Sequence, residues 1–204
     1  MTQQQSTMTL LRHGLPESSQ SEQIFRGVTD DLLTELGWQQ MTNALNSLTA
    51  LDLVISSPLR RCYDFAHKLA IDLNLPLQVF EELKEINFGQ WDGQSIQQIE
   101  LDYADKLKKF WQNPIENTPP NGESVLDFQQ RVINCWNNIL TENKGKNCLF
   151  IIHGGVQKII LAQILEMPVN AIHNIEVPYA CSSTIQIYYS ETGYVSTLKS
   201  HGKC

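Results

Sequence analysis

Two histidines of this 204-residue chain occupy matching positions. His13 follows the apolar run 8–11 and Arg12, His153 follows the apolar run 150–152, and a glycine comes directly after each. Because the carboxyl ends of buried parallel strands meet at one edge of a sheet, we expect both imidazoles to open onto one site. An imidazole there can serve as a nucleophile or transfer protons, and the glycines let a ligand approach the backbone. A purely structural role for both histidines is disfavoured because their contexts match.

Arginines stand beside these histidines. Arg12 directly precedes His13, and the tandem Arg60-Arg61 follows another apolar run and Ser56-Ser57-Pro58. One tandem arginine falls in the first turn of a predicted helix, where the peptide dipoles attract anions. Taken alone, such a pair is most often a solvated helix face. Together with Arg12 it predicts a guanidinium fork for an oxyanion such as phosphate.

A carboxyl group follows a third apolar run. Glu85 stands between the apolar Leu83 and Ile86, so it could be partly buried and act as a general acid. Two histidines, two arginines and one glutamate at successive strand ends indicate phosphoryl transfer through a histidine nucleophile. Arg26, in the loop after His13, is a further candidate for touching the substrate.

The composition excludes several classes of protein. Hydrophobic residues make up 42% of the chain, which excludes a disordered protein, and the net charge of −7 argues against nucleic acid as a partner. The chain has no membrane-length apolar run, and its first residues are polar, so we expect a cytoplasmic protein. Five cysteines without a CxxC pair fit a reducing compartment, with Cys62, Cys135 and Cys148 buried. The expected partner is a small phosphate ester, and a homodimer is an option.

Strand-like and helix-like segments alternate along the chain. We expect strands over 8–11, 51–55, 77–80, 148–152, 184–189 and 194–198, with helices after Thr34, from Pro58 and over 156–165. This order predicts a three-layer α/β/α sandwich with a mainly parallel sheet and an antiparallel hairpin at its C-terminal edge. Residues 1–7 are expected to be a disordered lead-in to a single domain, 8–204. Residues 86–145, including a helix from about Ser124 to Glu142, are expected to form a helical cap.

The ordered motifs resemble the histidine phosphatase superfamily, in the branch that includes phosphoglycerate mutase. The matching stretches are Arg12-His13-Gly14, Gly27…Asp30, Leu33-Thr34…Gly37…Gln40, Ser56-Ser57…Arg61, Glu85…Phe88-Gly89…Trp91-Asp92-Gly93 and His153-Gly154-Gly155. The resemblance implies a phosphohistidine on His13, with Arg12, Arg61, Glu85 and His153 as the other catalytic residues. It also implies that Arg12, Arg61 and His153 bind the substrate. Gly154 and Arg26, which follow strand ends in loops, are two further candidates for substrate binding. No metal or cofactor is expected.

The resemblance favours a metal-independent phosphomonoesterase. Within the superfamily the chain is most similar to the alpha-ribazole phosphatases of cobalamin biosynthesis, through Asn121-Gly122-Glu123-Ser124 and Met167-Pro168. Mutases carry an asparagine-containing run after Arg-His-Gly, whereas this chain has Leu15-Pro16-Glu17-Ser18-Ser19. Mutase activity, a broad sugar-phosphate phosphatase and a phosphate-binding module remain alternatives. A two-metal site is disfavoured because no aspartate lies beside either histidine.

Overall fold

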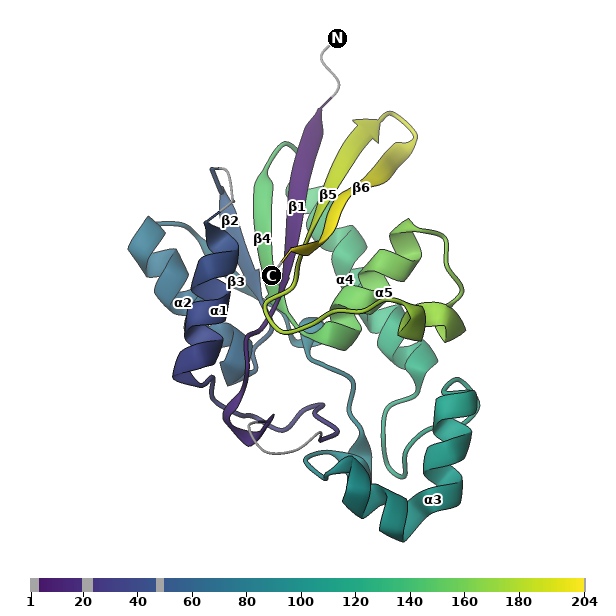
Figure 1. The fold of residues 1–204 in the computed structure, drawn as a ribbon. Coiled ribbons are helices and arrows are strands. Elements are labelled where there is room, and N and C mark those ends of the chain that lie inside the picture. The colour runs from purple at the N-terminus through teal and green to yellow at the C-terminus, as the bar shows by residue number, and fades with distance from the viewer. Residues whose placement is uncertain (1–3, 20–23, 47–49, 204) are drawn as a thin grey trace.

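The computed structural model describes residues 4–19, 24–46 and 50–203 (Figure 1). Its one sheet has the order β3-β2-β4-β1-β5-β6. The strands are β1 (Gln5–Arg12), β2 (Leu53–Ser56), β3 (Leu77–Val79), β4 (Asn147–Ile152), β5 (Ser182–Ser190) and β6 (Gly193–Lys203). The helices are α1 (Glu35–Leu45), α2 (Arg60–Leu73), α3 (Ile96–Gln112), α4 (Val125–Glu142) and α5 (Gly154–Ile164).

The central strands are apolar throughout because both faces of the sheet are covered. Successive side chains of a strand point to opposite faces. Leu10 of β1 therefore packs with α4 and α5, whereas its neighbour Leu11 packs with α1 and α2. Figure 1 shows these two helix pairs on either side of the sheet. The three-layer α/β/α arrangement is confirmed.

The register of the sheet brings the two histidines to one edge. Strands β1 and β4 are parallel neighbours with Arg12 opposite Ile152, so His13 and His153 both follow directly at the carboxyl ends. The backbone N–H of His13 donates to the carbonyl of Ile152 at 2.9 Å, which extends the pairing to the histidine itself. Strand β2 runs parallel to β4 on its other side and ends at Ser56.

The last two strands form the expected antiparallel hairpin. Strand β5 pairs antiparallel with β1, and β6 pairs antiparallel with β5 at the edge of the sheet. All four cysteines within the described residues are buried, including Cys62, Cys135 and Cys148, as expected, and Cys204 lies outside those residues. None of the described helices is long and apolar enough to cross a membrane.

Strand β1 begins earlier than the sequence suggests. The lead-in expected over residues 1–7 ends before Gln5, because residues 5–7 pair with β5 and Thr7 also pairs with β4. The buried Ser6 hydroxyl accepts from the N–H of Gly145 at 2.8 Å. These polar residues enter the sheet because neighbouring strands offer partners to their backbone groups. Residues 1–3 lie outside the described part of the chain.

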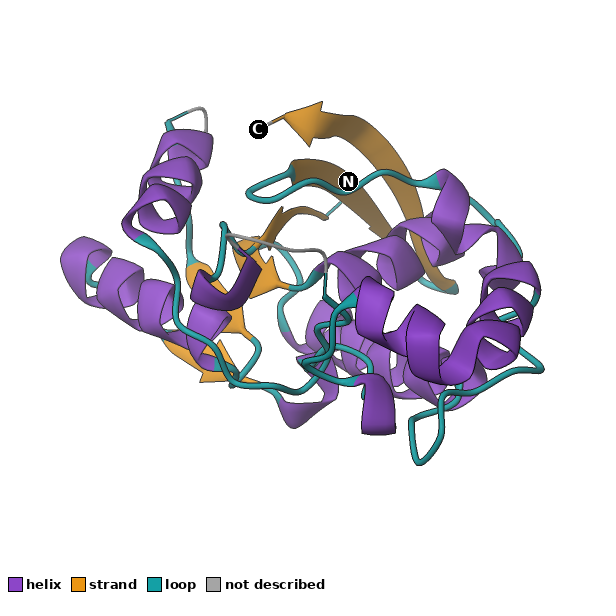
Figure 2. Cartoon of the chain, turned by 60° about the horizontal axis from the view of Figure 1, so that its bottom comes forward, coloured by secondary structure: helices purple, strands orange, loops and turns teal. Residues whose placement is uncertain are grey.

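The cap is smaller than the predicted insertion 86–145. Helix α4 begins where expected, with the Ser124 hydroxyl accepting from Asp127 N–H, yet it belongs to the layer on the sheet. Its side chains Phe128, Val132 and Trp136 are fully buried in the same core cluster as the strand residues, whereas the buried residues of α3 form a separate cluster. Helix α3 and its flanking loops form the cap. In Figure 1, α3 lies at the bottom of the molecule. Figure 2 turns this side toward the viewer and shows helices and loops in front of the strands.

A separate small core holds the cap together. Phe25, Trp91, Ile99, Leu107 and Phe110 form a cluster of their own beside the sheet domain. The Ser95 hydroxyl caps α3 by accepting from Gln98 N–H. The cap is therefore attached to the loop that contains Phe25 and Arg26, and this loop leads from β1 to α1.

Candidate active site

His13 is an almost buried imidazole with a defined orientation. It is 3% exposed, and its Nδ1 lies 2.9 Å from the Gly14 carbonyl oxygen. A carbonyl only accepts hydrogen bonds, so Nδ1 carries the proton and Nε2 keeps its lone pair. Nδ1 is thus tied to the backbone, which leaves Nε2 as the nucleophilic nitrogen.

Arg61 lies fully buried beside the two histidines. Its Nε donates to His153 Nδ1 at 3.2 Å, and its two terminal nitrogens donate to the carbonyls of Thr29 and Gly27, each at 2.6 Å. A guanidinium has five N–H groups, so each terminal nitrogen keeps one more to offer. Two parallel donors of this kind suit a phosphate.

The loop that receives Arg61 is held by a motif residue from the cap. The carboxylate of Asp92 accepts from the backbone N–H groups of Val28 and Thr29, at 2.8 and 3.0 Å. This arrangement turns the carbonyls of Gly27 and Thr29 toward the arginine. Asp92 therefore positions Arg61 indirectly, through the backbone.

Arg12 forms the second guanidinium of the site. One terminal nitrogen donates to the Val177 carbonyl at 2.6 Å, and the planar group lies over the ring of Tyr179, 4.1 Å from its centroid. Its buried Nε has no hydrogen-bond partner among the residues that the structure describes. Gly154 packs directly against this guanidinium, where a larger residue would crowd it. Within the described residues, neither Arg12 nor Arg61 forms a salt bridge with a carboxylate.

His153 engages both of its ring nitrogens. Nδ1 accepts from Arg61, so Nε2 carries the proton and donates to the hydroxyl of Ser57 at 2.7 Å. Its ring centroid lies 5.3 Å from that of His13, in an edge-to-face arrangement. In the structure the ring nitrogens of His153 contact Arg61 and Ser57, and the contact with phosphate that the sequence suggests stays a prediction.

Glu85 is held by backbone donors on both carboxylate oxygens. Oε1 accepts from Ile86 N–H at 3.0 Å, and Oε2 accepts from Gly155 N–H at 2.8 Å. Gly155 permits this approach, because a side chain there would collide with the carboxylate. The Glu85 carboxyl therefore reaches the start of α5, two residues after His153.

Arg131 of α4 fixes the loop before Glu85. It donates to the carbonyls of Glu82 and Lys84 and to that of Glu85 itself, at 2.6, 2.8 and 3.1 Å. A salt bridge to Glu123, with Nε and Oε1 2.6 Å apart, completes its contacts. The position of the carboxyl thus depends on a helix that begins nearly forty residues later.

Arg26 lies at the edge of the site and is neutralised locally. Its guanidinium contacts the carboxylate of Asp31 and the hydroxyls of Ser18 and Ser19. Burial, and next the charge of Arg61, lowers the pKa of Arg26 to about 10, so it stays protonated near neutrality. The sequence places Arg26 in the substrate site, and the structure places it on the wall of the adjoining cleft.

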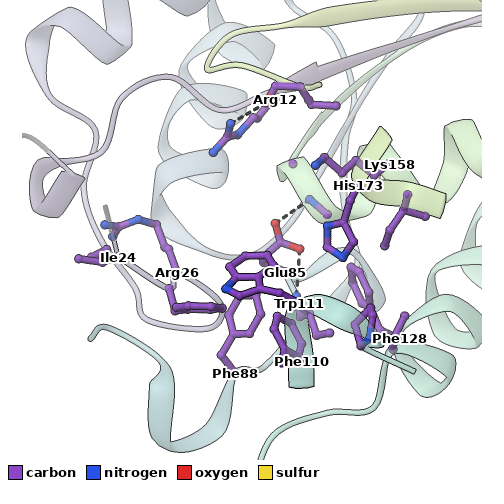
Figure 3. A pocket seen from close by; sticks show the side chains of 18 of the residues that line it. Arg12, Ile24, Arg26, Glu85, Phe88, Phe110, Trp111, Phe128, Lys158 and His173 are labelled. Atoms are coloured by element: carbon purple, nitrogen blue, oxygen red, sulfur yellow. Dashed lines mark hydrogen bonds between the residues drawn. The ribbon is translucent and has the colours of Figure 1, made fainter. Parts of the chain in front are cut away.

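A cleft of about 310 Å³ adjoins these residues. Arg12, Glu85 and Gly155 line it, whereas the buried His13, Arg61 and His153 do not. Most of the wall is apolar and comes from the cap, α4 and the segment before β5. Figure 3 shows Phe88, Phe110 and Trp111 among the side chains that line it, below Glu85 in this view. The cleft therefore presents a mostly apolar wall next to Arg12 and Glu85.

Several residues of this site escape motif analysis. Tyr179, which stacks on Arg12 and lies 5.7 Å from His13 between ring centroids, stands in a loop without any recognisable pattern. Lys158 and His173 also line the cleft, although His173 gives no sign of a role in the sequence. Ser57 and Asp92 lie inside the quoted motifs, but their contacts are not evident from the motifs. Among the described residues, no three His, Cys, Asp or Glu side chains are grouped to bind a metal ion.

Burial and charge keep both histidines neutral. Burial lowers the pKa of His13 well below its usual range, and the positive charges of Arg61 and Arg12 lower it further. Burial, followed by Arg61, has the same effect on the pKa of His153. An unprotonated imidazole is therefore present at neutral pH, as a nucleophile requires.

We expect the protein to lose stability as the pH falls below about 6.5. Each unfolded imidazole takes up a proton near its ordinary pKa of about 6.5, whereas the lowered pKa keeps the folded form neutral. The unfolded state then binds more protons, so the free energy of unfolding falls by up to about 1.4 kcal/mol per pH unit for each histidine. Urea denaturation between pH 7.5 and 5.5 measures this slope. His13→Gln should lower it, the exposed control His67→Gln should not, and equal slopes in all three proteins contradict the assignment.

Comparisons with known proteins agree with this arrangement. A family model described as the histidine phosphatase superfamily (branch 1) matches residues 8–199. The adenosylcobalamin/alpha-ribazole phosphatase of Escherichia coli K12 is 30% identical over 183 residues, covering 87% of this chain and 88% of that protein. A bifunctional protein of Mycobacterium tuberculosis is 29% identical over 198 residues, 96% of this chain but 54% of its own length. The chain thus spans about half of that relative.

A solved structure has the same fold. The crystal structure of the alpha-ribazole phosphatase from Shigella flexneri superimposes with a TM-score of 0.84 at 25% identity. The similarity covers 97% of this chain and 96% of that one.

Proposed function

Because the chain belongs to the histidine phosphatase superfamily (branch 1), we propose that it hydrolyses a small phosphate monoester through a phosphohistidine on His13, without a metal ion. One observation carries this proposal. The oriented, neutral imidazole of His13 lies beside two guanidinium groups that no described carboxylate neutralises. Positive charge that a metal ion supplies in other phosphatases comes here from Arg12 and Arg61.

In the first step Nε2 of His13 attacks phosphorus as the ester P–O bond breaks on the opposite side. The Nδ1–H bond to Gly14 stabilises the positive charge that the imidazole gains. The free N–H groups of Arg12 and Arg61 bind the non-bridging oxygens, where negative charge is concentrated. His153 holds the Arg61 guanidinium in place, and the Gly154 backbone lies close to Arg12.

Glu85 handles the proton in both steps. Its carboxyl donates a proton to the leaving alkoxide, and the resulting carboxylate then takes a proton from the water that attacks phospho-His13. That second attack breaks the N–P bond and releases phosphate. The fixed carboxyl on the wall of the cleft supports this role, since the alcohol leaves on that side.

Glu85→Gln should slow alkyl phosphates far more than aryl phosphates. An alkoxide with a pKa around 15 needs the proton as it departs, whereas p-nitrophenolate leaves without one. We expect kcat to fall by about 10²–10⁴-fold for glycerol 3-phosphate and by less than about tenfold for p-nitrophenyl phosphate. The neighbouring Glu82→Gln is the matched control. Equal losses on both esters exclude Glu85 as the general acid.

The intermediate itself tests the proposal. The enzyme is mixed with ³²P-labelled substrate and quenched in alkali within milliseconds. We expect a phosphate on His13 that is labile in acid and stable in alkali. The same labelling is expected in excess EDTA. Absence of a labelled histidine during rapid turnover, or loss of turnover in EDTA, contradicts the scheme. Isomerisation of 3-phosphoglycerate in place of phosphate release would favour a mutase.

The natural ester is a finer question. Alpha-ribazole 5′-phosphate is one candidate, supported by the names of two similar proteins, a relative and a solved structure. Phosphate release from a panel that also contains phosphosugars and phosphoserine ranks the candidates by kcat/KM. A preference of at least about 100-fold for alpha-ribazole 5′-phosphate would support that assignment, and a preference for another ester would reject it.

A further inference from the structure

The apolar cleft beside Glu85 contains an ammonium group that the scheme above does not use. Lys158 lies on α5, one helical turn after Gly154 and Gly155, and its side chain lines the cleft. It is half-buried and forms no hydrogen bond or salt bridge within the described part of the chain. A positive charge in such surroundings is costly unless an anion approaches it.

His173 lies next to this lysine. The charge of Lys158 acts on the His173 ring, and Figure 3 shows both side chains among those that line the cleft. Burial lowers the pKa of His173, with the charge of Lys158 as the second cause, so its ring is neutral and can donate one N–H. Trp111 packs edge-on against it, with ring centroids 5.8 Å apart. Lys158 and His173 are two hydrogen-bond donors on a wall that is otherwise mostly apolar.

Glu85 does not serve as the missing partner. Both of its carboxylate oxygens are held by backbone N–H groups, and no ion pair with Lys158 forms. The charges of Glu85 and Glu176 act on Lys158, but neither carboxylate forms a salt bridge with it within the described residues. The phosphate of the proposed reaction pairs with Arg12 and Arg61, so Lys158 keeps no ion-pair partner among the described residues.

Resting on the proposed function, we infer that the alcohol half of the preferred substrate carries its own carboxylate or other acid group, bound by Lys158 and His173. The phosphate occupies the arginine pocket, and the acid group reaches along the cleft toward α5. The buried apolar side chains Phe110 and Ile172 in this wall lower the local polarity, which strengthens the pairing. We therefore expect a higher kcat/KM for esters whose alcohol carries an acid group than for esters whose alcohol is neutral. Alpha-ribazole 5′-phosphate belongs to the neutral class.

Two three-carbon esters test this inference. 3-Phosphoglycerate and glycerol 3-phosphate differ only in a carboxylate against a CH₂OH group. A hydrogen bond to a charged group predicts at least about a tenfold higher kcat/KM for 3-phosphoglycerate in the wild type. Lys158→Gln should bring that ratio to within about threefold of one, and Lys158→Arg should retain most of it.

The exposed Lys68→Gln provides the matched control, and its ratio should equal that of the wild type. If the wild type hydrolyses both esters with equal kcat/KM, or Lys158→Gln keeps the preference, the acid-binding role is refuted while the phosphatase stands. If the wild type hydrolyses neither these esters nor p-nitrophenyl phosphate, the proposed function fails and this inference fails with it.

Discussion

Replacing His13 with alanine is expected to lower kcat by at least about 10⁴-fold on every phosphate ester. The reason is that His13 supplies the only free imidazole nitrogen in the arginine pocket among the described residues, since both nitrogens of His153 are engaged. Without it, neither the phosphoenzyme nor a bypass through His153 is available. Steady-state phosphate release and rapid-quench labelling both measure the loss.

Two further variants separate chemistry from folding. His13→Asn keeps an N–H that can donate to the Gly14 carbonyl but has no nucleophilic nitrogen, so it should be equally inactive while remaining folded. His67→Ala removes an exposed histidine of α2 and should keep wild-type turnover. Residual activity of His13→Ala within about tenfold of the wild type would refute the nucleophile.

Arg61→Ala should lower kcat/KM by about 10³–10⁵-fold. Each terminal nitrogen of this buried guanidinium uses one N–H on a backbone carbonyl, and in the proposed reaction the other N–H binds the charge that develops on the phosphoryl oxygens. The variant also leaves the carbonyls of Gly27 and Thr29 without their donor, at a cost of about 1–3 kcal/mol each in stability. Activity is therefore compared only at temperatures where circular dichroism shows a folded protein.

The adjacent arginine is the matched control. Arg60 is half-exposed and pairs with Asp64 across one turn of α2, so Arg60→Ala should change kcat/KM by less than about threefold. Arg61→Lys keeps the charge but loses the planar fork, and should recover only part of the activity. Removing Arg61 should also raise the pKa of His13, shifting the acidic limb of the pH–rate profile upward. Equal effects at positions 60 and 61 would remove Arg61 from the site.

Local patterns suffice for much of this fold because its core strands are short and apolar. The runs ending at Arg12, Ser56 and Ile152 are strands, and the helices beginning after Thr34 and Ser124 are capped as their sequences indicate. Periodicity does not say which surface an apolar stripe covers. The stripe of α4 could equally have faced a cap, and only the packing against β1 and β4 assigns it to the sheet.

The sequence alone determined that two histidines, two arginines and a glutamate follow buried strands, because strand ends and glycines are properties of neighbouring residues. The tertiary structure decided what these groups do to one another. Arg61 and His153 are 92 positions apart and meet only because β2 and β4 lie side by side in the sheet. Burial and the charge of Arg61 lower the pKa values of His13 and His153. Burial likewise lowers the pKa of Lys158. Both effects depend on residues that are far apart in the sequence and meet only in the folded chain.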